Sequence, residues 1–318
     1  MPSRLGPLNG GALRYSMKFK IADIVFELIS HYPRIFKEDR DYLNRYGAFI
    51  YKGKQNAKIK ISVEVVETLP GVRGKEIFAV YEPVSGYERW RLWENKDEYV
   101  YHCPIPERAA MAFISKDFSR ARAYVPPYEG KFAWDAVDII YDMMQIMLIN
   151  YFAYRQNGLF LHAAAIKENG YALVFAGRSE SGKSTTARLW HRHSRAVVLN
   201  DDRVIVRKTA KGFFAYSGPW SGEFGHEATA VSAQASLRGL FVIEHAKKNF
   251  CRPLAVEGAF RALYPTLFPV FWDGRLMNNT VNLCEELMSR VAVSRLGFVK
   301  NKKVIPFVRR IVAEPNKL

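Results

Sequence analysis

The chain has 318 residues, of which 49% are hydrophobic and 25% charged, so it can form one or two globular domains and is neither disordered nor collagen-like. Lys and Arg outnumber Asp and Glu by 47 to 31, a net charge of +16 that favours an anionic partner. Only three cysteines occur, at Cys103, Cys251 and Cys284, too widely spaced for a disulfide framework. We therefore expect a reducing, cytoplasmic location.

The positive charge is concentrated in the second half of the chain. Residues 1–150 hold 22 Lys and Arg against 19 Asp and Glu, a net charge of +3. Residues 151–318 hold 25 against 12, a net charge of +13. The second half is therefore expected to bind an anion. No recognisable nucleic-acid-binding module accompanies this charge, so we expect no nucleic-acid partner.

The first half is predicted to be a β-rich domain of unknown role over residues 17–132. Residues 1–16 contain Gly and Pro but no apolar segment of a signal peptide, so they are expected to form a flexible tail. Residues 57–68 alternate between polar and apolar side chains, which is typical of a strand. Further short strands are predicted at 76–81, 88–93 and 99–102.

A long helix is predicted over residues 133–156, ended by Gly158. Asp135, Asp138 and Asp142 would form a solvated stripe on one face of this helix. Residues 137–154 are the most apolar stretch, but their acidic side chains disfavour a membrane span, so we expect a buried helix and no membrane partner. A second domain is expected over residues 133–318.

Strands and helices are mixed in the second half, which favours an α/β or α+β fold with a mixed sheet. Asn169-Gly170 is typical of a tight hairpin turn between two strands. Strands are predicted at 159–166, 171–176, 196–199, 203–207, 213–216, 237–244 and 294–299, and helices at 183–191, 258–267, 279–291 and 305–313.

The segment from Gly177 to Ser184 matches the phosphate-loop pattern G-x4-G-K-[ST] between a buried strand and a helix. Its glycines would let backbone N–H groups surround phosphate oxygens, and the helix N-terminus adds positive charge. Lys183 would reach the β- and γ-phosphates, and the Ser184 hydroxyl would bind Mg²⁺. We therefore predict ATP and Mg²⁺ as cofactors, held by Gly177, Arg178, Ser179, Glu180, Ser181, Gly182, Lys183, Ser184 and Thr185.

Asp201 and Asp202 follow a short apolar strand 18 residues after Lys183. One helix and one return strand fit in this interval, so both carboxylates could lie beside the loop. One of them would support the metal and the other would accept a proton from an attacking hydroxyl. The sequence does not show which aspartate has which role. This early return of the chain favours a mixed sheet over repeated βαβ units.

Other polar residues are candidates with alternatives. Glu223, in the Gly- and Ser-rich segment Ser217–Gly225, would bind metal or orient a substrate, unless the segment is only a packed turn. Arg238 would reach the γ-phosphate or the acidic pair, or else be a surface charge. His191 and His193 are expected at a solvated helix end.

These motifs together resemble the C-terminal domain of the HPr kinase/phosphorylase family and its related proteins, whose nucleotide site is similar to that of phosphoenolpyruvate carboxykinase. The resemblance covers residues 155–312. It rests on Leu161-His162-Ala163-Ala164-Ala165, the loop GRSESGKST, Asp201-Asp202, Gly218-Pro219-Trp220-Ser221-Gly222-Glu223, Leu237-Arg238-Gly239-Leu240, Phe271-Trp272-Asp273 and Arg295-Leu296-Gly297-Phe298.

The resemblance implies an ATP- and Mg²⁺-dependent kinase that transfers the γ-phosphate to a hydroxyl, such as a serine of an acidic protein or peptide. Its catalytic residues would be Asp201, Asp202, His162 and Lys183, and its metal ligands Ser184, Asp202 and Glu223. It also implies self-association into a homo-oligomer. Glu180 replaces a glycine of the family, and the phosphorylase signature is not recognisable. The alternatives are a kinase of a free serine-type metabolite and a nucleotide-binding regulatory protein without kinase activity.

Overall fold

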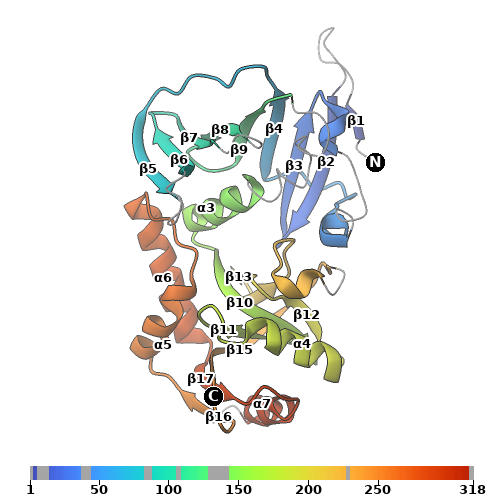
Figure 1. The fold of residues 1–318 in the computed structure, drawn as a ribbon, viewed down its shortest axis with the longest axis vertical. Coiled ribbons are helices and arrows are strands. Elements are labelled where there is room, and N and C mark those ends of the chain that lie inside the picture. Colours follow the sequence, from blue (N-terminus) through green and yellow to red (C-terminus); the bar gives the residue numbers. More distant parts are fainter. Residues whose placement is uncertain are drawn as a thin grey trace. The chain divides into compact units, whose positions relative to one another are not determined.

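The computed structural model describes residues 3–5, 14–36, 44–81, 88–104, 109–127, 143–226 and 230–314. The chain divides into two compact units, Met1–Leu43 with Ile50–Tyr154 and Asn44–Phe49 with Arg155–Leu318. Each unit has its own sheet (Figure 1). The predicted boundary between residues 132 and 133 and the predicted acidic stripe of Asp135, Asp138 and Asp142 lie outside the described residues.

The first unit contains a mixed sheet. Its strands are β1 (Ser3–Leu5), β2 (Arg14–Ile21), β3 (Ile24–Ser30), β4 (Ile59–Val65), β5 (Lys75–Tyr81), β6 (Glu88–Glu94), β7 (Glu98–Cys103), β8 (Ala110–Ser115) and β9 (Arg120–Val125). Their order is β1-β2-β3-β4-β9-β8-β7-β6-β5, with parallel pairing only of β3 to β4 and β4 to β9 among these described strands. Ile59, Ile61 and Val63 of β4 are buried at alternate positions, which confirms the strand predicted there.

Two predictions for the first half are wrong at particular residues. Arg14–Ser16, expected in a flexible tail, belong to β2 and pair with Ser3–Leu5, because the adjacent β3 anchors β2 in the sheet. The helix α3 (Gln145–Arg155) ends before Gly158, since Gln156 takes the left-handed conformation that ends a helix, with φ 50°. Gly158 begins the next strand.

The second unit combines a sheet with four helices among its described residues. Its strands are β10 (Gly158–Glu168), β11 (Tyr171–Ala176), β12 (Val197–Asn200), β13 (Arg203–Thr209), β14 (Gly212–Tyr216), β15 (Gln234–His245), β16 (Phe250–Pro253) and β17 (Val293–Phe298). Its helices are α4 (Lys183–His193), α5 (Val256–Leu263), α6 (Gly274–Arg290) and α7 (Val304–Ala313). Both positive φ angles of Asn169 and Gly170, 50° and 84°, confirm the tight turn predicted between β10 and β11.

Strands of the second unit pair in the order β11-β10-β13-β14-β15-β17-β16, while β12 pairs with β10 beside β13. Since β15 also pairs with β11, the pairing from β10 through β13 and β14 returns to β11. β11 with β15 and β15 with β17 are parallel, and the other ladders are antiparallel. The unit is therefore α+β with a mixed sheet, as predicted.

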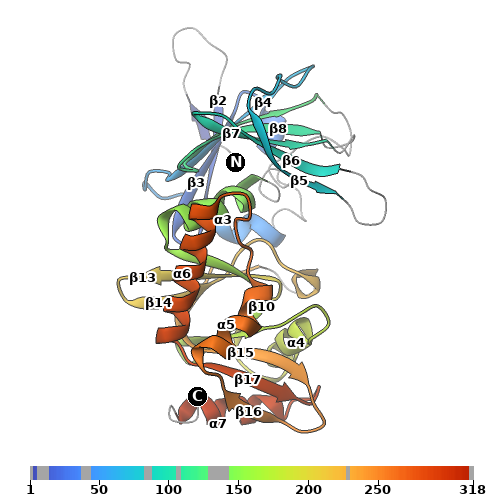
Figure 2. The ribbon, with the colours of Figure 1, turned by 90° about the vertical axis from the view of Figure 1, so that its left-hand side faces the viewer.

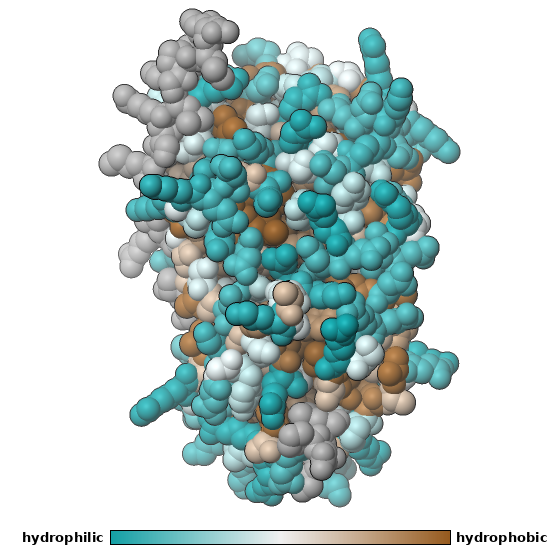
Figure 3. Space-filling model, turned by 180° about the vertical axis from the view of Figure 1, so that it is seen from behind, coloured by the Kyte–Doolittle hydropathy of each residue, from teal (hydrophilic) through white to brown (hydrophobic). Residues whose placement is uncertain are grey.

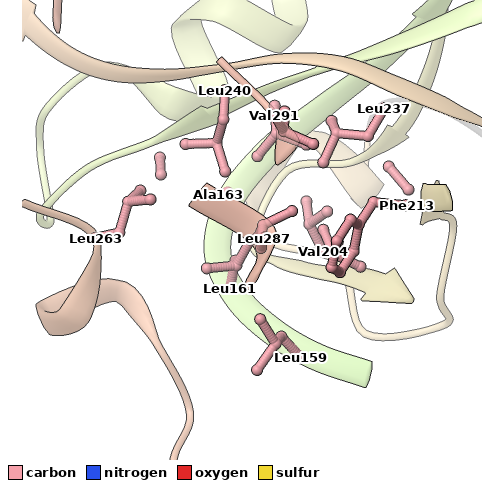
Figure 4. Packing of buried hydrophobic residues seen from close by; sticks show 14 of the residues in the cluster. Leu159, Leu161, Ala163, Val204, Phe213, Leu237, Leu240, Leu263, Leu287 and Val291 are labelled. Carbon is pink, nitrogen blue, oxygen red and sulfur yellow. The ribbon is translucent and has the colours of Figure 1, made fainter. Parts of the chain in front are cut away.

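Helices cover both faces of this sheet, α5 and α6 on one face and α4 and α7 on the other (Figure 2). Alternate residues of the strands point to opposite faces, which explains why both faces carry a hydrophobic core. Figure 4 shows the core beneath α6, where Leu161 and Val204 of the sheet pack near Leu287 and Val291. The opposite core contains Trp190 of α4, which is fully buried beside Phe175.

Hydrophilic side chains cover most of the face shown in Figure 3, with small scattered hydrophobic areas. Across the ranges that the structure describes, no helix is long and apolar enough to cross a membrane.

Candidate functional site

The predicted site residues gather at one edge of the second unit's sheet. β11, β15 and β17 run in the same direction, so their carboxyl ends lie together at that edge. The Gly177–Ser184 loop follows β11, His245 is the last residue of β15, and Lys300 follows β17. The long connections between these strands separate the three segments in sequence but not in space.

The antiparallel register of β10 brings the acidic pair to the same edge. Ala163 pairs with Ala176 at the root of the loop, and its neighbour His162 pairs with Arg203. The Ala163 N–H also donates to the Asp202 carbonyl over 3.1 Å. The Asp201-Asp202 turn therefore lies beside the loop, which is the arrangement expected from the sequence.

Steric and conformational demands explain the glycines of the loop. A Cβ on Gly177 would lie 2.4 Å from Ser181 Oγ, too close for any side chain. Gly182 has φ 101°, and a Cβ there would lie 2.8 Å from both the His245 and Phe298 rings. Glu180 has φ 64°, a conformation that favours glycine, and its side chain is exposed.

His245 supports this strained part of the loop. Its Nε2 lies 3.1 Å from the Glu180 carbonyl oxygen, which only accepts hydrogen bonds, so the Nε2 donates. The His245 ring also packs against Phe298, with centroids 5.4 Å apart. The contact holds the peptide of Glu180 in its left-handed turn.

Lys183 folds back over the loop. Its Nζ donates to the Gly177 carbonyl over 3.2 Å and to the Arg178 carbonyl over 2.9 Å, and the residue is only 7% exposed. Burial lowers the pKa of Lys183, an effect that the charges of Asp202 and Asp201 oppose. An anion bound beside Lys183 would stabilise its ammonium group.

Asp201 fixes the Ser217–Gly225 segment. Its Oδ1 accepts from the Gly222 N–H over 2.8 Å, its Oδ2 accepts from the Phe224 N–H over 3.0 Å, and it is only 2% exposed. A Cβ on Gly222 would lie 3.0 Å from Asp201 Oδ2, so the close approach favours glycine. Both carboxylate oxygens of Asp201 therefore accept hydrogen bonds from the backbone of this segment.

Asp202 is bound by two basic side chains. His162 Nε2 lies 3.1 Å from Asp202 Oδ1, and Arg203 Nη1 donates to Oδ2 over 2.7 Å. Burial raises the pKa of Asp202, but the hydrogen bond from His162 and the charges of Arg203, His162 and Lys183 outweigh it, so the pKa lies below its usual value. The carboxylate is thus ionised at neutral pH.

These residues line a hollow of about 880 Å³, which we call the first hollow. Lys183, Asp202 and His162 come from the start of α4, the β12–β13 turn and β10, so three elements supply the charged groups. The full lining is His162, Ser179, Glu180, Gly182, Lys183, Ser184, Thr185, Arg188, Asp201, Asp202, Gly222, Glu223, His245 and Lys300.

Glu223 reaches this hollow from an exposed position. Its side chain is 78% exposed and lies 3.3 Å from Arg188 of α4. Within the described ranges, no three His, Cys, Asp or Glu side chains are grouped to hold a metal ion by themselves. A magnesium ion held chiefly by phosphate and water needs only one or two protein oxygens, so Ser184 and Asp202 fit that demand.

Three other candidates lie away from the first hollow. Arg238 is exposed near the amino end of β15, where Leu237 pairs with Ala172, so it cannot reach the loop that follows Ala176. Of the two alternatives given for Arg238, the structure supports the surface charge and excludes contact with the phosphate or the acidic pair, because the parallel register puts it at the opposite edge. His191 and His193 are exposed in the last turn of α4, as predicted.

Four residues of the site were not predicted from the sequence: Arg188, Arg203, His245 and Lys300. A sequence signal existed for His245 and Lys300, since each closely follows an apolar strand and the ends of parallel strands meet. Arg203 directly follows the acidic pair but shows no pattern of its own. Arg188 is one turn after Ser184, on the same side of the helix.

The fold and the site define a class: an α+β protein with a mixed sheet and a Gly- and Lys-containing loop that joins a buried strand to a helix, opposite an Asp–His pair. Residues 131–301, more than half of the chain, match the family of the SynChlorMet cassette protein ScmC. The chain belongs to this family. The match assigns the chain to the ScmC family and not to the HPr kinase family, which its motifs resemble.

The chain is also similar to a solved structure. The HPr(Ser) kinase/phosphatase from Coxiella burnetii is a similar solved structure, with 11% identity and a TM-score of 0.26, over 50% of this chain and 95% of that one. No curated protein matches the sequence.

Proposed function

We propose that the chain is an ATP- and Mg²⁺-dependent phosphotransferase that phosphorylates a hydroxyl group. The observation that carries the proposal is the meeting of Lys183 and the His162–Asp202 pair in the first hollow. A buried lysine among backbone carbonyls is suited to a phosphate, and an ionised carboxylate opposite it is suited to an acceptor hydroxyl.

The residues of the loop fit a nucleotide triphosphate. Lys183 is a buried cation that donates hydrogen bonds to two neutral carbonyl groups, those of Gly177 and Arg178. Gly182 has φ 101°, and this left-handed turn helps the backbone N–H groups of the loop to surround an anion. Ser184 would hold Mg²⁺, which when bound neutralises charge on the phosphates, while Asp202 is assigned to the acceptor hydroxyl.

The side chains would divide the work of the transfer. Asp202 accepts the proton of the acceptor hydroxyl. At the same time the hydroxyl oxygen forms a bond to the γ-phosphorus, and the bond between the γ-phosphorus and the β–γ bridging oxygen breaks. Lys183 and the loop amides stabilise the negative charge on the oxygens of the transferred group. His162 and Arg203 orient the Asp202 carboxylate, and both hydrogen bonds keep it ionised.

Asp201 has a different role in this proposal. Both of its oxygens accept backbone N–H groups of the Ser217–Gly225 segment, so it positions that wall of the first hollow. We therefore assign the role of general base to Asp202 and a positioning role to Asp201. The sequence alone did not distinguish these two adjacent aspartates.

Incubation of the full chain with γ-labelled ATP, Mg²⁺ and host lysate tests the proposal. We expect label to move to a polypeptide, or to the small-molecule fraction if the acceptor is a serine-type metabolite. Lys183→Ala should abolish both the transfer and the calorimetric binding of ATP. Binding of ATP without any transfer of label would instead identify a nucleotide-binding regulatory protein and refute the kinase.

A further inference from the structure

A second hollow of about 570 Å³ lies next to the first. The two hollows share Ser179, Glu180 and His245, so they meet at one rim. Lys183, Ser184 and Asp202 line only the first hollow. The loop residues 177–181 line the second hollow together with Arg261 and Arg295, which are not among the residues predicted to hold the nucleotide.

Three arginines from three elements line the second hollow. Arg178 belongs to the loop, Arg261 to α5 and Arg295 to β17. More than 30 residues separate each of them from the next along the chain, and only the fold brings them together. Convergence of guanidinium groups on a hollow is a typical arrangement for binding a carboxylate or a phosphate.

Three arginines and two glutamates, Glu180 and Glu244, line the second hollow, which leaves a net positive charge among its acidic and arginine side chains. Arg295 pairs with Glu244 of the same hollow, with its Nη1 2.9 Å from Oε2. Arg261 pairs with Glu257, but both side chains are nearly four-fifths exposed, so a ligand can replace this weak pair. Arg178 is exposed and makes none of the ion pairs found among the described residues.

A neutral hydrogen-bonding group is also left over at this place. Ser181 lines the second hollow, and its Oγ is buried without a hydrogen-bond partner in the described part of the chain. Buried hydroxyl groups normally have a partner. This hydroxyl lies against Gly177 and becomes a donor to a ligand in the hollow only when its side chain turns away from that glycine.

We propose that the second hollow binds an oxyanion, a carboxylate or a phosphate, of the molecule that accepts the phosphoryl group. This inference rests on the proposed function, because it needs the nucleotide in the first hollow. An acceptor anchored by Arg261 and Arg295 would reach across the shared rim, so that its hydroxyl enters the first hollow.

Calorimetric titration of the full chain with inorganic phosphate tests the proposal, both without nucleotide and with a saturating non-hydrolysable ATP analogue. We expect phosphate to bind while the analogue occupies the first hollow. The double variant Arg261→Gln/Arg295→Gln, which leaves the predicted ATP-binding residues intact, should weaken this binding about tenfold or more, because charge-assisted hydrogen bonds are lost. Arg238→Gln is the matched control, an exposed arginine at the other end of β15, and should leave it unchanged.

The outcomes separate the two proposals. If the analogue binds but excludes phosphate, or if the double variant binds phosphate as well as the wild type does, the second hollow is no acceptor site. If the analogue itself fails to bind, the proposed function is refuted. In the transfer assay the double variant should raise the KM for the acceptor and not that for ATP. Label in the polypeptide or in the small-molecule fraction then shows whether the oxyanion belongs to an acidic peptide or to a metabolite, and an unchanged acceptor KM refutes the inference.

Discussion

Two adjacent aspartates of the same chemical type take different positions in this site. Asp201 is buried and accepts two backbone N–H groups, whereas Asp202 is bound by His162 and Arg203 and faces Lys183. The two residues form the turn between β12 and β13, and these neighbours in sequence meet different surroundings. The difference leads to separate predictions for the two carboxylates.

Asp202→Asn should abolish most of the transfer and leave ATP binding nearly unchanged. The amide cannot accept the hydroxyl proton, and loss of a general base typically slows transfer by about 10²–10⁴-fold. Single-turnover transfer and calorimetric ATP binding measure the two effects, with Lys183→Ala as the variant that should lose both. Normal transfer by Asp202→Asn would show that another group is the base.

The variant also has an expected pH dependence of stability. The folded pKa of Asp202 lies below its unfolded value of about 3.9, so its carboxylate stabilises the fold above that pH. This contribution is lost as the pH falls through the folded pKa. Urea unfolding should therefore show a difference between wild type and Asp202→Asn near neutral pH that shrinks in acid.

At the scale of elements, sequence patterns predicted most strands and helices of the second unit but not their edges. β15 begins at Gln234, three residues before the predicted strand, and β16 was not predicted, because both gain their pairing from distant strands. The strand-loop-helix unit from β11 to α4 was predicted closely, since local signals decide each part of it.

Gly182→Ala should damage the loop without unfolding the chain. Gly182 has φ 101° and its added Cβ would meet the His245 and Phe298 rings at 2.8 Å, so the loop must move. We expect ATP affinity to fall by tenfold or more, which is about the effect of 1.4 kcal/mol. Gly170→Ala is the control, because it is also left-handed, at φ 84°, but has open space around it and lies far along β11 from the loop. Equal ATP affinity in both variants and the wild type would contradict this account of the loop.

At the scale of the whole molecule, two hydrophobic cores hold helices against both faces of the second sheet. Leu287 of α6 is completely buried in the core that Figure 4 shows. Since the sheet edge, the loops that leave it and α4 carry the side chains of the first hollow, the packing of the sheet and its helices sets the distances of the site.

Leu287→Ala should lower the free energy of unfolding by about 2–5 kcal/mol, through lost burial and a cavity. Denaturant unfolding measures the change. Val256→Ala is the control, because Val256 is 52% exposed on α5, and its effect should stay within about 0.5 kcal/mol. A Leu287 variant as stable as the control would mean that α6 is not held by this core.

The sequence by itself determined the local parts of this protein: the alternating strands, the Asn-Gly turn, and the loop from Gly177 to Ser184 with its lysine at the start of a helix. These follow from side-chain period, glycine conformation and helix termini, which act over a few residues. Only the tertiary structure decided that His162 and Arg203 bind Asp202, that Asp201 holds a distant loop, and that Arg178, Arg261 and Arg295 share a hollow. Those contacts depend on the register of paired strands and on helix packing, which join residues far apart in the chain and leave no pattern in the sequence between them.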